Sequence, residues 1–312
     1  MLSPDSDITF LGPQSRQPTV HTVLGADDAP VCVISAGWRE REGELEELER
    51  LEGMAGRQVE DLRLYRRIDD AFSRDRELFA AHRQRQTRLK QAQRLYRLRL
   101  GHALRAAREL FASDDGDLLA AERRSAMAAL RTLDRHHLRR IRRIHEAFAQ
   151  RWRPAERDAI AAHVAELKAA IERSSAVLIA GGHVGVLLSR MRLLGVPGLI
   201  TGRRVVAWSA GAMALAERVV LFHDHPPQGA GDPEVLDAGF GLVRGVVALP
   251  HAHARLRLDD ERRVALFARR FAPSLCLALE PHTLLRWRNG ELVEAQSAGR
   301  LHRKGSVQSL AA

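Results

Sequence analysis

A single serine, Ser209, lies between an apolar run and an alanine-rich stretch in the segment VVAWSAGAMALAERV, residues 205–219. The β-branched residues before it predict a buried strand, and the stretch after it predicts a helix. A side chain at such a corner is lifted out of the sheet, and only small neighbours avoid a clash there. Ala207 and Gly211 occupy these neighbouring positions. The pattern favours a nucleophile for acyl transfer over a helix N-cap, the common role of a serine before a helix.

Two backbone amides are predicted to form an oxyanion hole beside this serine. The helix that follows Ser209 presents free N–H groups in its first turn, so the amide of Ala210 is one donor. A second strand end, AVLIAGGHVG, places a glycine pair before another helical stretch. Because glycine lets the backbone approach a ligand closely, the amide of Gly182 is the second predicted donor. Gly181 and His183 are then expected near the substrate.

A serine nucleophile needs a base, and the base needs an acid that fixes its orientation. The run GVVALPHAHARL places His251 and His253 directly after a strand-like stretch, where both can face the same side. His253, like Gly181 and His183, is expected near the substrate. The segment LFHDHPPQG supplies Asp224, fifteen residues after Ser209. Reactive groups gather at the carboxyl ends of strands in an α/β sheet, so the predicted chain order of the site is Ser, Asp, His.

The same histidines support a second interpretation, a metal site. His223 and His225 flank Asp224. The other His-x-His pair is His251 and His253. Imidazole nitrogens are common zinc ligands, although no cysteine or further carboxylate stands nearby in the sequence. Packing or surface roles are also open, because the chain has 14 histidines.

Composition narrows the classes of function. The formal net charge is +10, from 49 Lys and Arg against 39 Asp and Glu. Three of the basic residues are lysines, and charge runs of this kind are usually solvated helix faces, so nucleic-acid binding is not expected. No run of 18 apolar residues predicts a membrane span. The first residues lack the features of a secretory signal, so we expect a cytoplasmic protein in which Cys32 and Cys276 are buried free thiols.

The residue composition and the spacing of apolar residues change along the chain. In residues 1–66 and 171–297, short apolar runs alternate with helical stretches, which predicts a mostly parallel sheet flanked by helices, an α/β fold. Residues 67–170 are glycine-poor and charged, with apolar residues three and four apart, so an inserted helical hairpin or bundle is predicted. The tyrosines and arginines of this insert are expected on packing and solvent faces. The polar tail at 298–312 is expected to be loose.

Four segments occur in an order that resembles a known family: AGGHVGVLL, AWSAGAMAL, GFGLVRGVVALPHAHARL and LALEPHTLLRWRNG. They are similar to the serine peptidase family of dipeptidase E and cyanophycinase. The resemblance implies the flavodoxin-like fold of the class I glutamine amidotransferases, with serine in place of cysteine. It covers residues 176–294 and the strand at 31–37, and the helical insert has no counterpart in the small dipeptidases.

The resemblance implies roles for particular residues. Ser209 corresponds to the nucleophile and His251 to the base. The amides of Gly182 and Ala210 correspond to the oxyanion donors. Asp224 lies near the place of the aspartate in the dipeptidases.

Other positions refine or depart from the family pattern. Glu280 stands in the family's Asp-Glu-x-Thr-Ala segment and is a reserve orienting acid. The chain has His183 where a third glycine or an asparagine is usual, and alanine replaces phenylalanine after His251. These departures bear on the substrate more than on the chemistry. The amidotransferase His-x-Glu pair is absent because His253 stands in the place of the glutamate, which argues against glutamine hydrolysis.

The residues and the resemblance together predict a serine-dependent amide or peptide hydrolase that needs no cofactor and acts on a small or acidic peptide. Ser209 attacks the carbonyl, and His251 takes the proton and returns it to the leaving amine. Two alternatives remain open: a non-catalytic sensor or scaffold with an amidotransferase-like fold, and a metal-dependent hydrolase that uses the histidine cluster. The helical insert is a candidate surface for assembly of a homo-oligomer.

Overall fold

The computed structural model describes residues 6–25, 29–113, 116–224 and 231–311. Its central sheet has seven strands in the order β11-β10-β1-β5-β4-β2-β3. Five neighbouring strands are parallel: β1 (Asp7–Leu11), β5 (Arg204–Trp208), β4 (Val177–Ile179), β2 (Val31–Ile34) and β3 (Val59–Asp61). The antiparallel hairpin of β10 (Leu284–Arg288) and β11 (Glu291–Gln296) completes the sheet beside β1. The predicted α/β fold with a mostly parallel sheet is confirmed.

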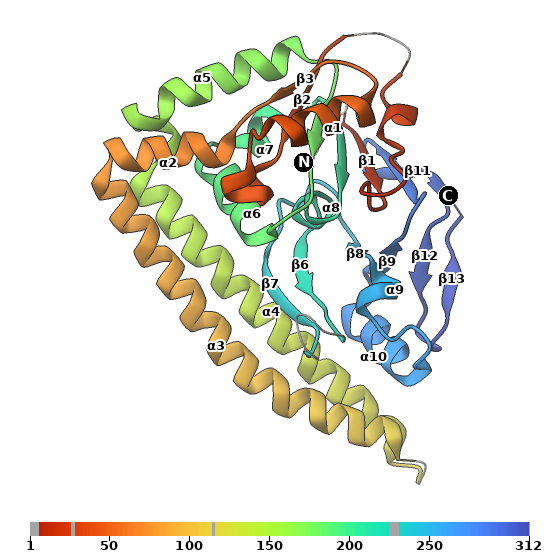
Figure 1. Ribbon diagram of the computed structural model, residues 1–312. Helices are drawn as coiled ribbons and strands as arrows, with labels where there is room; N and C mark the ends of the chain where they lie inside the picture. The colour runs from red at the N-terminus through yellow and green to blue at the C-terminus, as the bar shows by residue number, and fades with distance from the viewer. Residues whose placement is uncertain (1–5, 26–28, 114–115, 225–230, 312) are drawn as a thin grey trace.

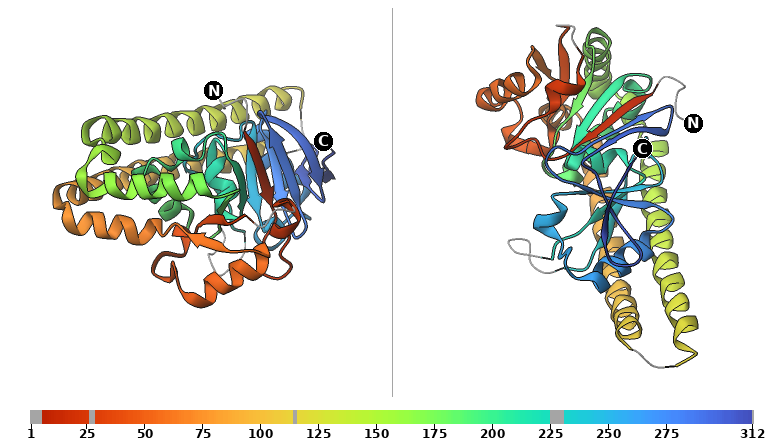
Figure 2. Two further views of the ribbon diagram at one scale, coloured as in Figure 1. Left: turned by 90° about the horizontal axis from the view of Figure 1, so that it is seen from above. Right: turned by 90° about the vertical axis from the view of Figure 1, so that its right-hand side faces the viewer.

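Both faces of the sheet are buried along β1, β5, β4 and β2, which explains why these strands are nearly continuous apolar runs. Alternate side chains point to opposite faces, so Val205 and Ala207 join one apolar cluster and Val206 joins the other. One face is covered by α6 (Val184–Leu193), α7 (Val196–Leu199) and α8 (Ala210–Leu215). The other is covered by η1 (Val20–Val23) and α1 (Leu45–Ala55), as Figures 1 and 2 show.

A second, four-stranded sheet lies beside the first, in the order β13-β12-β9-β8. Its buried parallel strands are β8 (Val246–Pro250) and β9 (Leu275–Leu279). The connection between them contains α9 (Ala252–Arg255) and α10 (Glu261–Phe271). A separate antiparallel pair is formed by β6 (Arg218–Leu221) and β7 (Glu234–Ala238).

The last residues of the described chain form two strands, whereas the sequence predicts a loose tail there. β12 (Gly299–Leu301) pairs with β9 and with β13 (Val307–Ser309). Leu301 joins the main apolar cluster, and the edge of β9 holds β12 through backbone hydrogen bonds, which depend little on side-chain type. The expectation of a loose tail is therefore wrong for residues 299–309.

A helical segment separates β3 from β4 in the chain. Its elements are α2 (Leu64–Arg74), α3 (Arg76–Ala112), α4 (Leu119–Trp152), η3 (Pro154–Glu156) and α5 (Asp158–Arg173). α3 and α4 form a long antiparallel hairpin along one side of the molecule (Figures 1 and 2). Their buried apolar residues belong to the same cluster as one face of the sheet, so hairpin and sheet share a core. Although α3 has 37 residues, no helix within the described ranges is long and apolar enough to cross a membrane.

A buried polar network joins this hairpin to the rest of the fold. The guanidinium of Arg270 on α10 donates to both carboxylate oxygens of Asp134 on α4, at 2.8 Å each. The hydroxyl of Tyr96 on α3 donates to Asp134 at 2.7 Å and accepts from Arg270 at 2.8 Å. Arg270 also donates to the carbonyl of Pro233 at 2.6 Å. The charges are satisfied only when α3, α4 and α10 are packed together, so the network acts as an anchor.

Removing one member of the network should be costly. Arg270→Met leaves the Asp134 carboxylate buried without its cation, and we expect the free energy of unfolding to fall by about 3–5 kcal/mol. Urea denaturation measures the change. The matched variant Arg262→Met removes an exposed arginine from the same helix and should alter stability by less than about 0.5 kcal/mol. A loss for Arg270→Met no larger than that of the control would contradict an anchoring role.

Candidate active site

Ser209 lies where β5 ends and α8 begins, in an uncommon backbone conformation. Its φ is 51° and its ψ is −119°. A positive φ is rare for a residue with a β-carbon and strains the backbone by about 1–3 kcal/mol. Two glycines make room for this junction. A β-carbon on Gly211 would overlap the carbonyl of Ile179, and one on Gly181 would lie 3.0 Å from Cβ and 3.5 Å from Oγ of Ser209.

Two backbone amides beside Ser209 have no partner within the described parts of the chain, those of Gly182 and Ala210. Gly182 has a φ of 109°, and a β-carbon on it would overlap Gly37, so only glycine fits there. His183 follows it, donating its amide to the carbonyl of Gly37 at 2.7 Å and capping α6 through Nδ1. The two predicted oxyanion amides are therefore free to bind a carbonyl oxygen.

Strand register links Ser209 to a second strand end. Leu11 of β1 pairs with Trp208, so Gly12 and Ser209 are the next positions on adjacent strands. The backbone of Glu280 packs directly against Gly12, where a β-carbon would overlap its carbonyl. Neither β1 nor Gly12 was singled out in the sequence, although the apolar run ITFL followed by Gly-Pro is a strand-and-turn signal.

The same register brings His251 to this edge. In the second sheet, Pro250 of β8 pairs with Leu279 of β9, which places His251 beside Glu280. The amide of His251 donates to the carbonyl of Leu279 at 3.1 Å. β8 and β9 therefore deliver a histidine and a carboxylate to the place where β1 and β5 end.

His251 is half-buried and begins α9 with a φ of 57°. Burial lowers the pKa of its ring, the positive charge of Arg255 lowers it further, and the negative charge of Glu280 opposes both. The imidazole is therefore neutral near pH 7, the form that can accept a proton. The described residues include no hydrogen bond between this ring and the Ser209 hydroxyl. Such bonds commonly tighten only when substrate is bound.

Asp224 is positioned differently from the sequence expectation. Its buried carboxylate forms an ion pair with Arg263, whose Nε donates to it at 2.7 Å, and accepts the amide of Arg257 at 3.1 Å. Burial and the charge of Arg255 lower the pKa of His223, and the charge of Asp224 opposes them. Asp224 is not among the causes of the His251 shift. The structure does not bring Asp224 and His251 together.

Glu280, the reserve acid of the sequence analysis, lies near His251, and its negative charge favours the protonated form of that ring. It also contacts His253, whose amide donates to Oε1 at 2.7 Å and whose Nδ1 lies 3.1 Å from the same oxygen. The side chain of His253 is largely exposed. Of the two histidines after β8, His251 is thus the one withdrawn from solvent.

The metal interpretation involves residues that the structure describes only in part. His225 lies outside the described residues. Within the described ranges, no group of three or more His, Cys, Asp or Glu side chains is arranged to hold a metal ion. His223 is near Asp224, and its Nδ1 is buried without a partner in the described part of the chain. The four-histidine cluster therefore stays a prediction from the sequence.

Comparisons with known proteins were made at three levels. No protein-family model matches the chain, and no curated protein matches it. The chain is similar to the crystal structure of a peptidase from an acI-B1 Actinobacterium, with 13% identity, a TM-score of 0.47, and coverage of 98% of this chain and 94% of that one. It is also similar to a protein provisionally named peptidase E from Listeria monocytogenes EGD-e, with 11% identity, a TM-score of 0.45, and coverage of 95% and 99%.

The protonation of His251 gives a test that needs no substrate. We expect its ring pKa to lie below 6.5 when ring-proton shifts are followed by NMR across pH, with His251→Ala used for assignment. Arg255→Gln removes a positive charge and should raise the pKa. Glu280→Gln removes a negative charge and should lower it further. A pKa above 6.5, or shifts of the opposite sign in the two variants, would contradict this electrostatic description.

Proposed function

We propose that this protein is a serine hydrolase that cleaves an amide bond, with Ser209 as the nucleophile and His251 as its base. The observation that carries the proposal is the strained position of Ser209 between two unpartnered amides. The strained turn holds the Ser209 hydroxyl beside the free amides of Gly182 and Ala210, which suit the oxygen of a substrate carbonyl. Residues at three strand ends then supply the nucleophile, the base and the oxyanion donors of an acyl-transfer site.

The proposed reaction has two halves. Ser209 Oγ attacks the carbonyl carbon while His251 accepts the hydroxyl proton, and the negative oxygen of the tetrahedral intermediate accepts hydrogen bonds from Gly182 and Ala210. The intermediate collapses as His251 gives its proton to the leaving amine, and the acyl group remains on the serine as an ester. Water then attacks the ester, His251 takes a proton from it, and the acid product leaves with Ser209 restored.

Glu280 is proposed to be the positioning acid. Glu280 directly follows Leu279, the β9 residue that pairs with Pro250, so it lies beside His251. Its negative charge favours the protonated form of the His251 ring. The imidazolium that forms during attack is stabilised in this way without a proton reaching the glutamate. Asp224 is not proposed for this role because Arg263 already neutralises it.

A small or acidic peptide is the proposed substrate class, since the net charge of +10 attracts anions to the surface. Fluorophosphonate labelling and a substrate panel test the reaction. The panel contains short peptides with acidic N-terminal residues, isoaspartyl peptides and simple esters, each assayed with and without a chelator.

We expect the fluorophosphonate to label Ser209, and Ser209→Ala to lose labelling and turnover together. His251→Ala should lower kcat by about 10³-fold or more, because it removes the base. His253→Ala is the matched control, with an exposed histidine two residues away, and should be far milder. Turnover that survives Ser209→Ala but disappears with the chelator would favour the metal-dependent alternative. Absence of both labelling and turnover would favour the sensor or scaffold.

The two acids give a second test. Glu280→Gln should lower kcat by roughly 10²-fold or more with little change in KM, since it removes the charge that stabilises the imidazolium. Asp224→Asn breaks the ion pair with Arg263 and should lower thermal stability while kcat of the folded protein changes little. A larger kcat loss in Asp224→Asn than in Glu280→Gln would overturn this assignment.

A further inference from the structure

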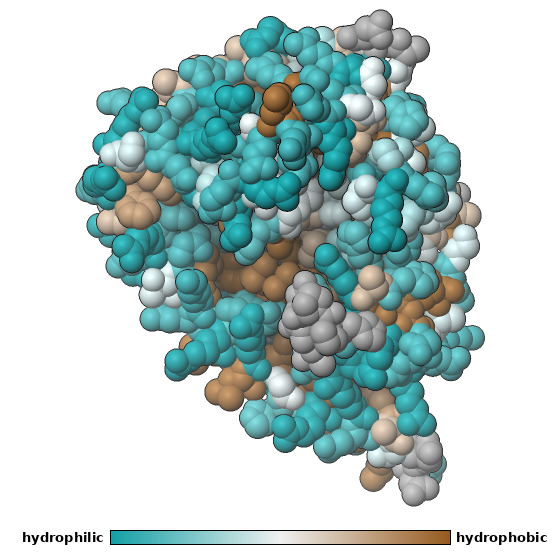
Figure 3. All heavy atoms as spheres, viewed as in Figure 1, coloured by the Kyte–Doolittle hydropathy of each residue, from teal (hydrophilic) through white to brown (hydrophobic). Residues whose placement is uncertain are grey.

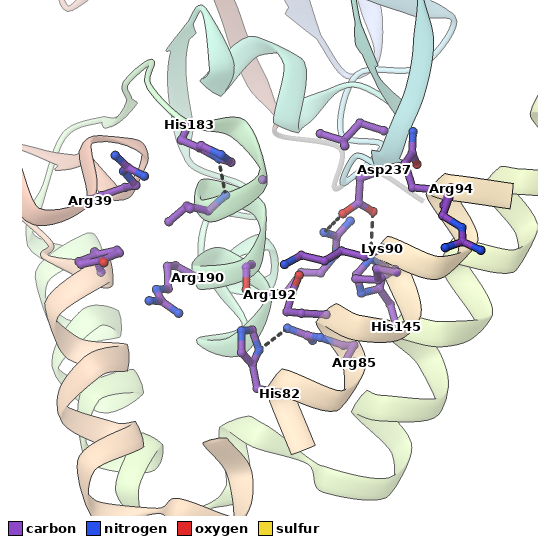
Figure 4. A pocket seen from close by; sticks show the side chains of 18 of the residues that line it. Arg39, His82, Arg85, Lys90, Arg94, His145, His183, Arg190, Arg192 and Asp237 are labelled. Carbon is purple, nitrogen blue, oxygen red and sulfur yellow. Dashed lines mark hydrogen bonds and ion pairs between the residues drawn. The ribbon is translucent and has the colours of Figure 1, made fainter. Parts of the chain in front are cut away.

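A cavity of about 640 Å³ lies between the helical hairpin and the central fold. Side chains from α3, α4, α6, η2 (Ala36–Arg41) and β7 line it, and Figure 4 shows them converging from these elements. Figure 3 shows that the face of the molecule seen in Figure 1 is hollowed near its centre, with a hydrophobic floor and a hydrophilic rim. His183 and Gly185 also line the cavity, so it reaches the turn that follows the oxyanion glycine, Gly182.

The lining of this cavity is strongly cationic. Seven arginines and lysines face two carboxylates, those of Glu40 and Asp237. The seven are Arg39, Arg85, Lys90, Arg94, Arg97, Arg190 and Arg192. Four of them have carboxylate partners: Arg39 with Glu40, Arg97 with Glu234, Arg190 with Asp69 and Arg192 with Asp237. The other three, all on α3, form no ion pair with a carboxylate in the described part of the chain.

Arg85 is the most informative of these three. It is 5% exposed, and one of its terminal nitrogens lies 2.9 Å from Nδ1 of His82, whose ring is neutral because burial lowers its pKa to about 3. Burial and the charges of Arg192 and Arg190 lower the pKa of Arg85 to about 10, although Asp237 opposes them. The side chain therefore stays charged at neutral pH, in a place where positive charges repel one another. A buried cation needs a counter-charge.

Four buried polar atoms of the lining lack hydrogen-bond partners within the described residues. They are Nε of Arg85, Nε of Arg190, Nδ1 of His145 and Oγ of Ser189. Nδ1 of His145 is an acceptor at neutral pH, because burial keeps the ring neutral and its Nε2 donates to Asp237 at 2.9 Å. The other three atoms can donate a hydrogen bond. Buried donors are nearly always satisfied, so their shared position around one cavity indicates a missing acceptor.

We propose that this cavity binds a small organic polyanion, carrying phosphate groups or several carboxylates. The anionic oxygens accept hydrogen bonds from Arg85, Arg190 and Ser189, and the exposed Lys90 and Arg94 close over the outer charges. One monovalent group cannot balance three unpaired cations, so at least two negative charges are needed. The apolar side chains of the lining, including Leu89, provide a surface for an organic body.

The proposal does not depend on hydrolysis at Ser209. The side chains proposed to bind the ligand come from α3 and α6, and none of them is assigned a step in the proposed reaction. A Ser209→Ala variant should bind the anion as the unchanged protein does. Binding and turnover can therefore fail separately.

Isothermal titration of the full chain with pyrophosphate and with citrate, at fixed ionic strength, tests the site. We expect saturable binding of at least one of them. Lys90→Gln/Arg94→Gln should weaken it by about tenfold or more, because two charge-assisted hydrogen bonds are lost from exposed residues that do not support folding. Arg85→Gln should weaken it at least as much, and its melting temperature shows whether the fold is intact.

The matched control is Arg88→Gln/Arg99→Gln, which removes two exposed arginines from the same helix that do not line the cavity. It should change affinity by less than about threefold, through long-range charge alone. Tighter binding of pyrophosphate assigns a phosphate-bearing ligand, and tighter binding of citrate assigns a polycarboxylate. No saturable binding of either probe, or equal weakening in the control and the Lys90→Gln/Arg94→Gln variant, would overturn the proposal.

Discussion

The candidate site depends on how closely the backbone segments at the ends of the strands approach one another. Gly211 lies against the end of β4, Gly181 lies against Ser209, and Gly12 lies against Glu280. At each of these contacts a single β-carbon would meet backbone or the serine side chain at too short a distance. The absence of side chains at these points lets β1, β4, β5 and the β8–β9 pair end within one small region. Every residue proposed to react is supplied by one of these ends.

Electrostatic conditions differ between this region and the neighbouring cavity. At His251, burial and Arg255 keep the ring neutral, while Glu280 favours the charged form that develops during proton transfer. In the cavity, Arg85 and its neighbours remain charged although they repel one another. The first arrangement suits a group that must gain and lose a proton, and the second suits a ligand that brings a permanent charge. His183, at the start of α6, lies at the border between the two.

The parts of the fold that depend on local pattern could be predicted from the sequence. The apolar runs of β2, β4, β5, β8 and β9 and the junction at Ser209 are of this kind. Long-range pairing could not be predicted. The position of Asp224 in the chain, between Ser209 and His251, suits the acid of a catalytic triad. In the structure its carboxylate is paired with Arg263, which lies 39 residues further along the chain. Glu280 reaches His251 only through the register of β8 with β9. The sequence predicts packing and solvent faces for the arginines of the insert. Arg85, Arg94 and Arg97 instead line the cavity, which forms only when α3 folds against α6 and η2.

The backbone conformation of Ser209 affects the stability of the strand-to-helix junction, whereas its side chain supplies a hydroxyl group. A residue at a φ of 51° and a ψ of −119° is held against its own conformational preference. Glycine adopts such angles without strain and would fit between Gly181 and Gly211 at least as well. Stability of the junction and chemistry of the hydroxyl group are therefore separable at this position, because a glycine would relieve the strain and would also remove the proposed nucleophile.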